Sequence, residues 1–164
     1  MKESRSHDVY VAASWTQIDK AKEAADALRE AGYAVWCFWE QGRGPVVPLI
    51  EALRGYDYEH PLWAKAWGKL EEVKMDDLLA IRDSLCVVLV EPAGNDAHFE
   101  AGFALGHDVP VVRYGDGKAG LMTFDALVAR TPDELVRAVA MRLGKPAGER
   151  GLVRTGQGDY AKDR

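Results

Sequence analysis

The stretch Gly94–His107, GNDAHFEAGFALGH, follows the strongest apolar run of the chain, Leu85–Val90, and precedes another, Val109–Val112. Short apolar runs on both sides of a segment rich in small residues are typical of a buried strand, a helix and a second buried strand. Together they predict a parallel crossover, and in open sheets of this kind ligands bind at the carboxyl ends of the strands. Glu100 lies in the first turns of the expected helix, so we expect it at the centre of a site.

The N-terminal third shows the same alternation of strand and helix. Val9–Ala13 is a short run of strand-forming residues, and Ala34–Trp39 is a second one. Between them apolar residues recur at helical spacing over Gln17–Ala31, with Thr16 as the expected N-cap. A strand, a helix and a strand within so short a segment predict a βαβ unit.

The sequence patterns that indicate the remaining helices and strands are less regular. The segment Glu40–Pro61 is interrupted by glycine and proline, a pattern usual in functional lids or partly disordered loops, although Val46–Arg54 has the composition of a short helix. The pattern further predicts helical segments within Leu62–Arg82, a fifth short strand at Leu121–Phe124, and a last helix that begins at Thr131 or Pro132 and ends near Leu143. The whole pattern predicts an α/β fold, a three-layer sandwich with a parallel sheet of about five strands.

The composition narrows the class of protein. The 164 residues are 48% apolar with a net charge of −5, which fits a globular domain and argues against nucleic-acid binding. We expect a single domain over residues 1–143 and a polar tail over residues 144–164. No stretch approaches about 18 uninterrupted apolar residues, so we expect no membrane partner and a cytoplasmic location. Cys37 and Cys86 lie inside apolar runs and are expected to be reduced core thiols.

Several side chains near the expected strand ends could carry chemistry. Glu100 could be catalytic or could only complement the helix dipole, and the nearby Gly102 and Gly106 suggest a helix packed closely against a sheet or a ligand. Asp77, next to Asp76, could supply a second carboxylate for acid–base work or could belong to a charged helix face.

Other candidates are aromatic or imidazole groups. Tyr10 alternates away from Val9 and Val11, so its hydroxyl could hold a carboxylate in place or simply have a backbone partner in the core. Trp15 is placed to stack on a flat base, whereas most of the other tryptophans are expected in the core. His98 is expected to make a loop or cap contact. No histidine has companions at metal spacing, and no phosphate-binding or dinucleotide-binding glycine motif is present, so we expect neither metal nor other cofactor.

Three blocks of the sequence resemble the nucleoside 2-deoxyribosyltransferase family, and most closely a mostly uncharacterised bacterial and phage subgroup of that superfamily. They are Tyr10–Trp15, Asp77–Ile81 and Gly94–Gly106, the last followed by Pro110–Val112. The resemblance implies a flavodoxin-like fold and a site built across subunit contacts, hence a homo-oligomer, dimer or higher. It also implies that Glu100 is the nucleophile, that Asp77 helps to handle the base or sugar, and that Tyr10 positions the nucleophile.

One position departs from the family pattern. Gly94 stands where the family's transferases typically place an aspartate that contacts the base, and Asn95 and Asp96 follow it. Related members hydrolyse the N-glycosidic bond of nucleoside monophosphates and hold the phosphate with the loop after the first strand, where this chain has Ser14. The resemblance therefore implies a nucleoside or nucleotide ligand. Taken with the positions of the residues, we expect contacts to this ligand from Ser14, Trp15, Asn95, Asp96 and His98. Deoxyribosyl transfer, N-glycoside hydrolysis, an NAD-glycohydrolase-like activity and a catalytically silent nucleotide-binding module all stay open.

Overall fold

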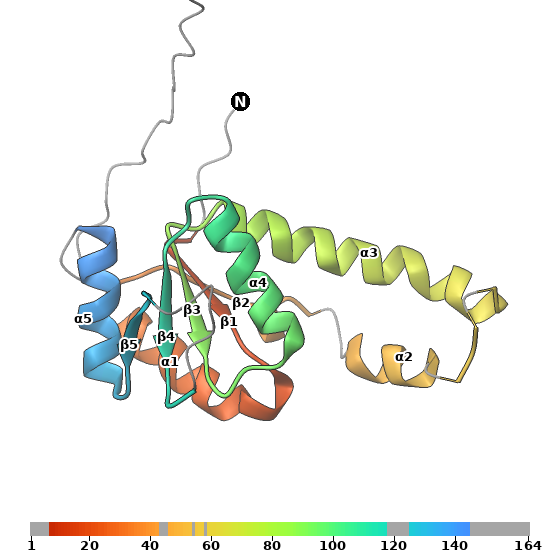
Figure 1. Ribbon diagram of the computed structural model, residues 1–164, viewed down its shortest axis with the longest axis horizontal. Coiled ribbons are helices and arrows are strands. Elements are labelled where there is room, and N and C mark those ends of the chain that lie inside the picture. Colours follow the sequence, from red (N-terminus) through yellow and green to blue (C-terminus); the bar gives the residue numbers. More distant parts are fainter. Residues whose placement is uncertain (1–6, 43–45, 54, 58, 118–124, 145–164) are drawn as a thin grey trace, which may run out of the picture.

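Five parallel strands form one sheet in the computed structural model of the protein, which describes residues 7–42, 46–53, 55–57, 59–117 and 125–144. The strands are β1 (Val9–Ala12), β2 (Val35–Cys37), β3 (Cys86–Val90), β4 (Val111–Tyr114) and β5 (Leu127–Ala129). Their order across the sheet is β2-β1-β3-β4-β5 (Figure 1). This is the strand order of flavodoxin-like folds, so the three-layer α/β prediction is confirmed.

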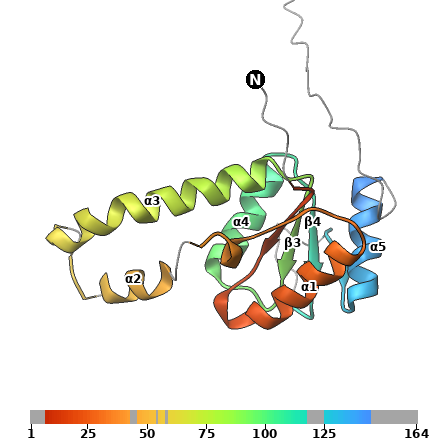
Figure 2. The same ribbon diagram turned by 180° about the vertical axis from the view of Figure 1, so that it is seen from behind.

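The helices lie on both faces of the sheet (Figures 1 and 2). Helix α1 (Ile18–Glu30) and helix α5 (Pro132–Leu143) cover one face, and α4 (Asn95–Gly106) covers the other together with the end of α3 (Pro61–Arg82). The short helix α2 (Val46–Leu53) contacts α3 away from the sheet, so the two form an arm that projects from the body. Two 3-10 turns, η1 (Trp15–Gln17) and η2 (Phe38–Glu40), follow β1 and β2.

Alternation along β1 decides which side chains face each helical layer. Val9 and Val11 belong to the core cluster under α1 and α5, whereas Tyr10 and Ala12 belong to the cluster under α4. All four are fully buried, as expected of a central strand covered on both faces. The prediction that Tyr10 faces away from Val9 and Val11 is therefore confirmed, and its hydroxyl is directed towards the layer that contains α4.

Several helix boundaries follow from their capping residues. Helix α5 begins as expected, because the Thr131 side chain accepts a hydrogen bond from the Glu134 amide, and Gly144 follows the helix with φ of 62°. Thr16 does not cap α1, which was a wrong prediction: its hydroxyl lies 2.8 Å from that of Ser14, and Gln17 precedes the helix instead. The Glu40–Pro61 segment contains a real helix at α2.

Other expectations need correction or lie outside the described residues. The fifth strand is Leu127–Ala129, and the predicted strand at Leu121–Phe124 lies outside the described residues, as does the tail from residue 145 onward. Cys37 and Cys86 are buried free thiols, as expected. The expectation that most tryptophans other than Trp15 lie in the core holds only in part. Trp36 and Trp39 are half-buried and pack against the two core clusters, Trp63 is half-buried, and Trp67 is exposed. In the described part of the chain, no helix combines the length and apolar character needed to cross a bilayer.

Candidate active site

The site lies where the strand order reverses, between β1 and β3. At such a switch point the loops after the two strands diverge, which leaves a crevice at their carboxyl ends. Here the two loops approach each other: a Cβ added at Gly94 would lie 3.5 Å from the Ser14 Cβ. Helix α4 begins directly after Gly94 and carries Glu100 over the sheet. The β1 loop, the β3 loop and the first turns of α4 therefore meet at this end of the sheet, where the sequence predicted a site.

Tyr10 and Glu100 meet in this region, although 90 positions separate them in the sequence. The Tyr10 hydroxyl donates a hydrogen bond of 3.0 Å to Glu100 Oε1. The Tyr10 ring is fully buried and is stacked on Trp36, with ring centroids 4.7 Å apart and an interplanar angle of 13°. Because parallel pairing sets Tyr10 opposite Trp36, the stacking is a consequence of the strand register. The phenol is therefore held in one orientation, with its hydroxyl on the carboxylate.

The surroundings of Glu100 disfavour its charged form. Burial of the carboxyl is the largest cause and raises its pKa to about 8. The hydrogen bond from Tyr10 acts in the opposite direction, since it stabilises the carboxylate. The negative charges of Asp77 and Asp96 raise the pKa further. Glu100 is thus an acid that is mostly protonated at neutral pH and that would be stabilised as a carboxylate by a nearby positive charge.

Asp77 reaches this region from the body end of α3. It is half-buried, and its charge acts on Glu100, so the two carboxyl groups share one environment although they lie on different helices. Asp76, its neighbour, is exposed. Of the two acids considered in the sequence, only Asp77 acts on the Glu100 pKa. A pair of interacting carboxyl groups in a crevice is a common feature of functional sites, because each changes the proton affinity of the other.

A cluster of aromatic side chains lies in the turns that follow β1 and β2. Trp15, in η1 after β1, is 42% exposed and makes an edge-to-face contact with Phe38, with ring centroids 4.9 Å apart. Phe38 makes a second edge-to-face contact with Trp39. Exposed aromatic faces held by aromatic neighbours are suited to stacking on a flat heterocycle. Trp15 was a predicted ligand contact, whereas Phe38 and Trp36 were not predicted.

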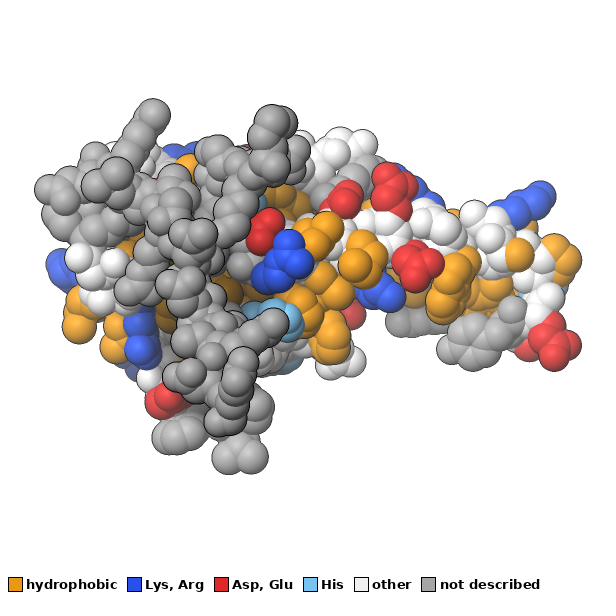
Figure 3. All heavy atoms as spheres, turned by 90° about the horizontal axis from the view of Figure 1, so that it is seen from above, with side chains coloured by type: hydrophobic (Ala, Val, Ile, Leu, Met, Phe, Trp, Pro, Cys, Tyr) orange, Lys and Arg blue, Asp and Glu red, His pale blue; other side chains and the backbone are white. Residues whose placement is uncertain are grey.

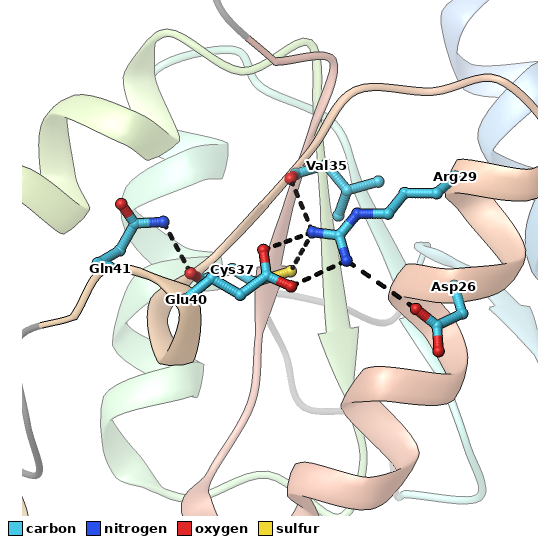
Figure 4. A network of polar contacts seen from close by, with 6 residues as sticks. All are labelled: Asp26, Arg29, Val35, Cys37, Glu40 and Gln41. Atoms are coloured by element: carbon cyan, nitrogen blue, oxygen red, sulfur yellow. Dashed lines mark hydrogen bonds and ion pairs between the residues drawn. The ribbon is translucent and has the colours of Figure 1, made fainter.

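A network of polar contacts fixes the turn that carries Phe38 (Figure 4). Both terminal nitrogens of Arg29, on α1, donate to the Glu40 carboxylate, at 2.9 Å and 2.6 Å. Arg29 also donates to the Val35 carbonyl, and the Gln41 amide donates to the Cys37 carbonyl. Bidentate pairs of arginine and carboxylate restrict orientation as well as separation. The network therefore joins η2 to α1 and keeps Phe38 against Trp15.

The other predicted site residues lie around the start of α4. Asn95, Asp96 and His98 are exposed on its first turns, and Ser14 is half-buried beside Gly94. Neither Asn95 nor Asp96 caps the helix, because the chain is already helical at both and Gly94 occupies the cap position. The His98 backbone amide donates to the Gly94 carbonyl, and its side chain lies on the helix surface. Of this group, only the charge of Asp96 acts on Glu100.

Gly102 and Gly106 differ from the expectation as well. A Cβ added at either would meet nothing within 4 Å outside the helix, so close packing against the sheet is not the reason for these glycines. The sheet-facing positions of α4 are occupied instead by Ala97, Ala101 and Ala104, all buried. The alanines, not the glycines, allow α4 to lie close to β1 and β3 and bring Glu100 within reach of Tyr10.

A buried ion pair stands at the neighbouring strand ends and was not predicted. Arg113, on β4, donates from Nε to Glu91 Oε1 at 2.9 Å, and both side chains are almost inaccessible to solvent. Arg113 also donates to the Gly117 carbonyl, and Lys20 donates to the Glu91 carbonyl. Glu91 Oε2 is buried and has no hydrogen-bond partner among the described residues. Through Arg113, these contacts join the loop after β3 to strand β4 and to the loop that follows β4.

The described residues contain no group of three or more His, Cys, Asp or Glu side chains placed to hold a metal ion. Glu100 and Asp77 act on each other, but no third ligand of suitable type completes a set within that part of the chain. The chemistry that the arrangement offers is that of a buried carboxyl group, an oriented phenol and a cluster of aromatic side chains.

Comparison with known proteins supports the fold. No protein-family model matches the chain, and no curated protein matches it by sequence. Among solved structures, the chain is similar to a 2-deoxyribosyltransferase from the psychrotolerant bacterium Bacillus psychrosaccharolyticus, with a TM-score of 0.58 and 15% identity. The likeness covers 78% of this chain and 89% of that one. At this identity the likeness establishes a shared fold, consistent with the flavodoxin-like prediction.

Proposed function

We propose that the protein acts on the N-glycosidic bond of a nucleoside or nucleotide, with Glu100 as the nucleophile. The observation that supports the proposal most strongly is the hydrogen bond from Tyr10, on a strand beside the switch point of the sheet, to Glu100. The resemblance in sequence blocks and the likeness in fold to a 2-deoxyribosyltransferase agree with it. In this proposal the functional unit is a homo-oligomer, and no cofactor takes part.

The proposed reaction is a double displacement. Glu100 attacks the anomeric carbon of the sugar, the bond from that carbon to the base nitrogen breaks with its electron pair on the nitrogen, and the base leaves. The transition state has oxocarbenium character, so positive charge develops next to the carboxylate. Asp77, Asp96 and the ionised form of Glu100 supply negative charge there. The mutual repulsion of these charges costs energy in the free protein and is relieved as the cation develops. Water or a second base then attacks the sugar carbon and releases Glu100.

Tyr10 and Asp77 have supporting roles in this proposal. Tyr10 donates to Oε1 of Glu100, which leaves Oε2 as the oxygen that attacks. Because the phenol is stacked on Trp36, the carboxyl group is oriented before substrate binds. Asp77, half-buried on α3, exchanges a proton with the leaving or entering base.

Substrate contacts follow from the remaining geometry. Trp15 offers its exposed face to the base, supported by Phe38. Ser14, Asn95, Asp96 and His98 line the loop and the first turn of α4 and contact the sugar, the base or a phosphate of the substrate. Gly94 leaves space beside Ser14 that a side chain would otherwise occupy. The crevice therefore combines a stacking surface with several hydrogen-bonding groups.

A substrate panel tests the proposal. The full chain is incubated with deoxynucleosides, ribonucleosides, their monophosphates and NAD, each with and without a second free base, and products are followed by chromatography. Base exchange identifies a transferase, and base release alone identifies a hydrolase. Intact-mass spectrometry of protein quenched during turnover should show a sugar adduct that is absent from Glu100→Ala. If Glu100→Ala keeps the parent's rate, the proposed mechanism is wrong.

A silent nucleotide-binding module is the second candidate. The raised pKa of Glu100 favours it, since a carboxyl that is largely protonated at neutral pH is a poor nucleophile. The two candidates differ in the panel above: the module binds a nucleoside or nucleotide, measured by calorimetry, without releasing base at any pH between 6 and 10. A rate that rises with pH as Glu100 ionises would exclude the module.

A further inference from the structure

The two turns that carry Trp15 and Phe38 follow neighbouring strands of the sheet. η1 follows β1, η2 follows β2, and these strands pair in parallel, so both turns stand at the same edge of the sheet. Trp15 and Phe38 meet edge to face between the turns, with ring centroids 4.9 Å apart. Trp15 is exposed whereas Phe38 is half-buried. Phe38 therefore limits the movement of an exposed aromatic ring.

Exposed apolar side chains also occur elsewhere on the molecule, so exposure alone does not single out Trp15. Figure 3 shows hydrophobic side chains along the arm of α2 and α3, interspersed with acidic and basic ones. Trp15 differs because its neighbour Phe38 lies in a turn that polar contacts hold in place (Figure 4). A 3-10 turn of three residues has few and poorly aligned hydrogen bonds of its own. The position of Phe38 therefore depends on the side-chain contacts around η2.

The main contact of this kind joins Arg29, near the C-terminal end of α1, to Glu40, the last residue of η2 (Figure 4). Two guanidinium nitrogens donate to the two carboxylate oxygens, at 2.9 Å and 2.6 Å. Arg29 also donates to the Val35 carbonyl on β2 and lies 3.9 Å from the Asp26 carboxylate. Exposed ion pairs usually contribute little, but bidentate arginine–carboxylate pairs within a network are an exception. The pair therefore fixes η2 relative to α1 and β2.

The pair and the proposed nucleophile lie on different sides of the sheet. Helix α1, which carries Arg29, covers one face, and α4, which carries Glu100, covers the other. The hydrogen bond to Glu100 comes from Tyr10 on β1, whose partners along the sheet are held by the strand register. Breaking the pair therefore releases η2 and leaves the contact between Tyr10 and Glu100 in place.

We propose that Arg29 and Glu40 are positioning residues for substrate binding. Their pair holds Phe38 against Trp15 and so keeps Trp15 in the orientation in which it stacks on the base. This inference rests on the proposed function, because it takes Trp15 as the surface that receives the base. Stacking stabilises the bound substrate and the transition state alike, since the reacting carbon belongs to the sugar. The pair should therefore act on KM and leave kcat nearly unchanged, as expected of uniform binding.

Steady-state kinetics of base release test the role of the pair. Arg29→Met and Glu40→Gln should each raise KM about threefold to tenfold, with kcat within about twofold of the parent's. Because both changes remove the same contact, the double variant should raise KM no further than the larger single change. Arg29→Lys keeps the charge without the bidentate geometry, so its KM should lie between those of the parent and Arg29→Met. The matched control, Arg82→Met, breaks an exposed pair with Asp83 on α3 and should keep the parent's KM.

A binding measurement separates this inference from the reaction at Glu100. The nucleosides and monophosphates of the substrate panel are titrated calorimetrically into the full chain carrying Glu100→Gln, and circular dichroism checks that each variant is folded. Adding Glu40→Gln, which leaves the bond from Arg29 to the Val35 carbonyl in place, should weaken binding of the tightest ligand about threefold to tenfold.

The outcomes distinguish the two proposals. Equal affinity with and without Glu40→Gln, a fall in kcat at unchanged KM, additive effects in the double variant, or no binding of any ligand in the panel overturns the role of the pair. A parent that binds nucleoside without releasing base contradicts the reaction at Glu100 and leaves the role of the pair intact. A parent that releases base, with unchanged kinetics in Arg29→Met and Glu40→Gln, contradicts only the role of the pair.

Discussion

Replacing Tyr10 with phenylalanine removes the hydroxyl that donates to Glu100 Oε1 at 3.0 Å and keeps the ring that stacks on Trp36. A hydrogen bond to a charged group contributes about 1.5–3 kcal/mol, and 1.36 kcal/mol corresponds to one pKa unit. Since this bond lowers the pKa of Glu100, its loss raises that pKa further above about 8. At pH 7 the ionised fraction of Glu100, and with it kcat/KM, should therefore fall by about tenfold to a hundredfold.

The assay is the pH dependence of base release. Initial rates at low substrate concentration, measured from pH 6 to pH 10, report the pKa of the essential group in the free enzyme. The parent's kcat/KM should rise with pH and show an inflection at about pH 8, the pKa of Glu100, because Glu100 attacks only as a carboxylate. In Tyr10→Phe the inflection should move to higher pH. The ratio of the parent's kcat/KM to that of the variant should therefore become smaller as the pH increases.

A matched control exists on the other side of the sheet. The Tyr114 hydroxyl donates to Glu23 Oε2, also at 3.0 Å, and Tyr114 belongs to the core cluster under α1 and α5. Tyr114→Phe removes the same kind of hydrogen bond and leaves the surroundings of Glu100 unchanged. The inflection in its kcat/KM against pH should therefore match the parent's. An unchanged inflection in Tyr10→Phe, with a deficit that is equal at every pH, would refute the view that Tyr10 acts on the ionisation of Glu100.

Three further outcomes follow from the charges in the structure. In Glu100→Gln the fold should be more stable than the parent at pH 9, by at most about 5 kcal/mol, and the gain should disappear below pH 4.5. The reason is that the unfolded chain ionises Glu100 above pH 4.5 whereas the folded protein keeps the proton up to about pH 8, so the parent loses stability in this range. Thermal unfolding at several pH values measures this difference. Asp77→Asn should move the kcat/KM inflection to lower pH while reducing the maximum, since the Asp77 charge raises the Glu100 pKa; an inflection that moves upward would contradict it. Arg113→Met leaves Glu91 buried without its partner and should cost about 3–5 kcal/mol in chemical denaturation. Arg130→Met, which breaks an exposed ion pair, should cost less than about 1 kcal/mol.

The parts of the fold that sequence patterns predicted are those in which burial leaves a regular signal. The central strands β1 and β3 are buried along their whole length, so they read as continuous apolar runs. Helix α5 has a side-chain cap at one end and a glycine at the other, which made its limits predictable within a residue. These signals are local, and they need no knowledge of the tertiary structure.

The parts that were missed depend on contacts between distant residues. Strand β5 has three residues, and Val128 at its centre is 40% exposed, so neither length nor alternation marks it. Helix α3 was expected only as helical segments. Gly68 interrupts its helical spacing of apolar residues, and its exposed side also carries large apolar residues, Trp67, Met75 and Leu79. Most of the tryptophans other than Trp15 were assigned to the core by residue type, but Trp67 lies on the projecting arm and is exposed.

The candidate site was predicted to a different degree for each residue. The location of Glu100 near a strand end followed from the order of strand and helix. Alternation along the first strand left a carboxylate as one of two possible partners for Tyr10, and the resemblance of two sequence blocks indicated Glu100. Phe38 was placed inside a strand, but β2 ends at Cys37 and a 3-10 turn redirects the ring towards Trp15. The charges of Asp96 and Asp77 act on Glu100 through space, which a linear pattern does not reveal.

The closeness of Gly117 to the Glu91 carboxylate links the mutational tolerance of two positions 26 residues apart. A Cβ added at Gly117 would collide with the carboxyl group of Glu91, which cannot move away because Arg113 holds it. In a saturation library, position 117 should therefore accept only glycine while position 91 is glutamate. Gly102 and Gly106, with open space around them, should accept alanine freely. Among homologous sequences, a side chain at 117 should occur together with a smaller residue at 91, so the two positions should covary.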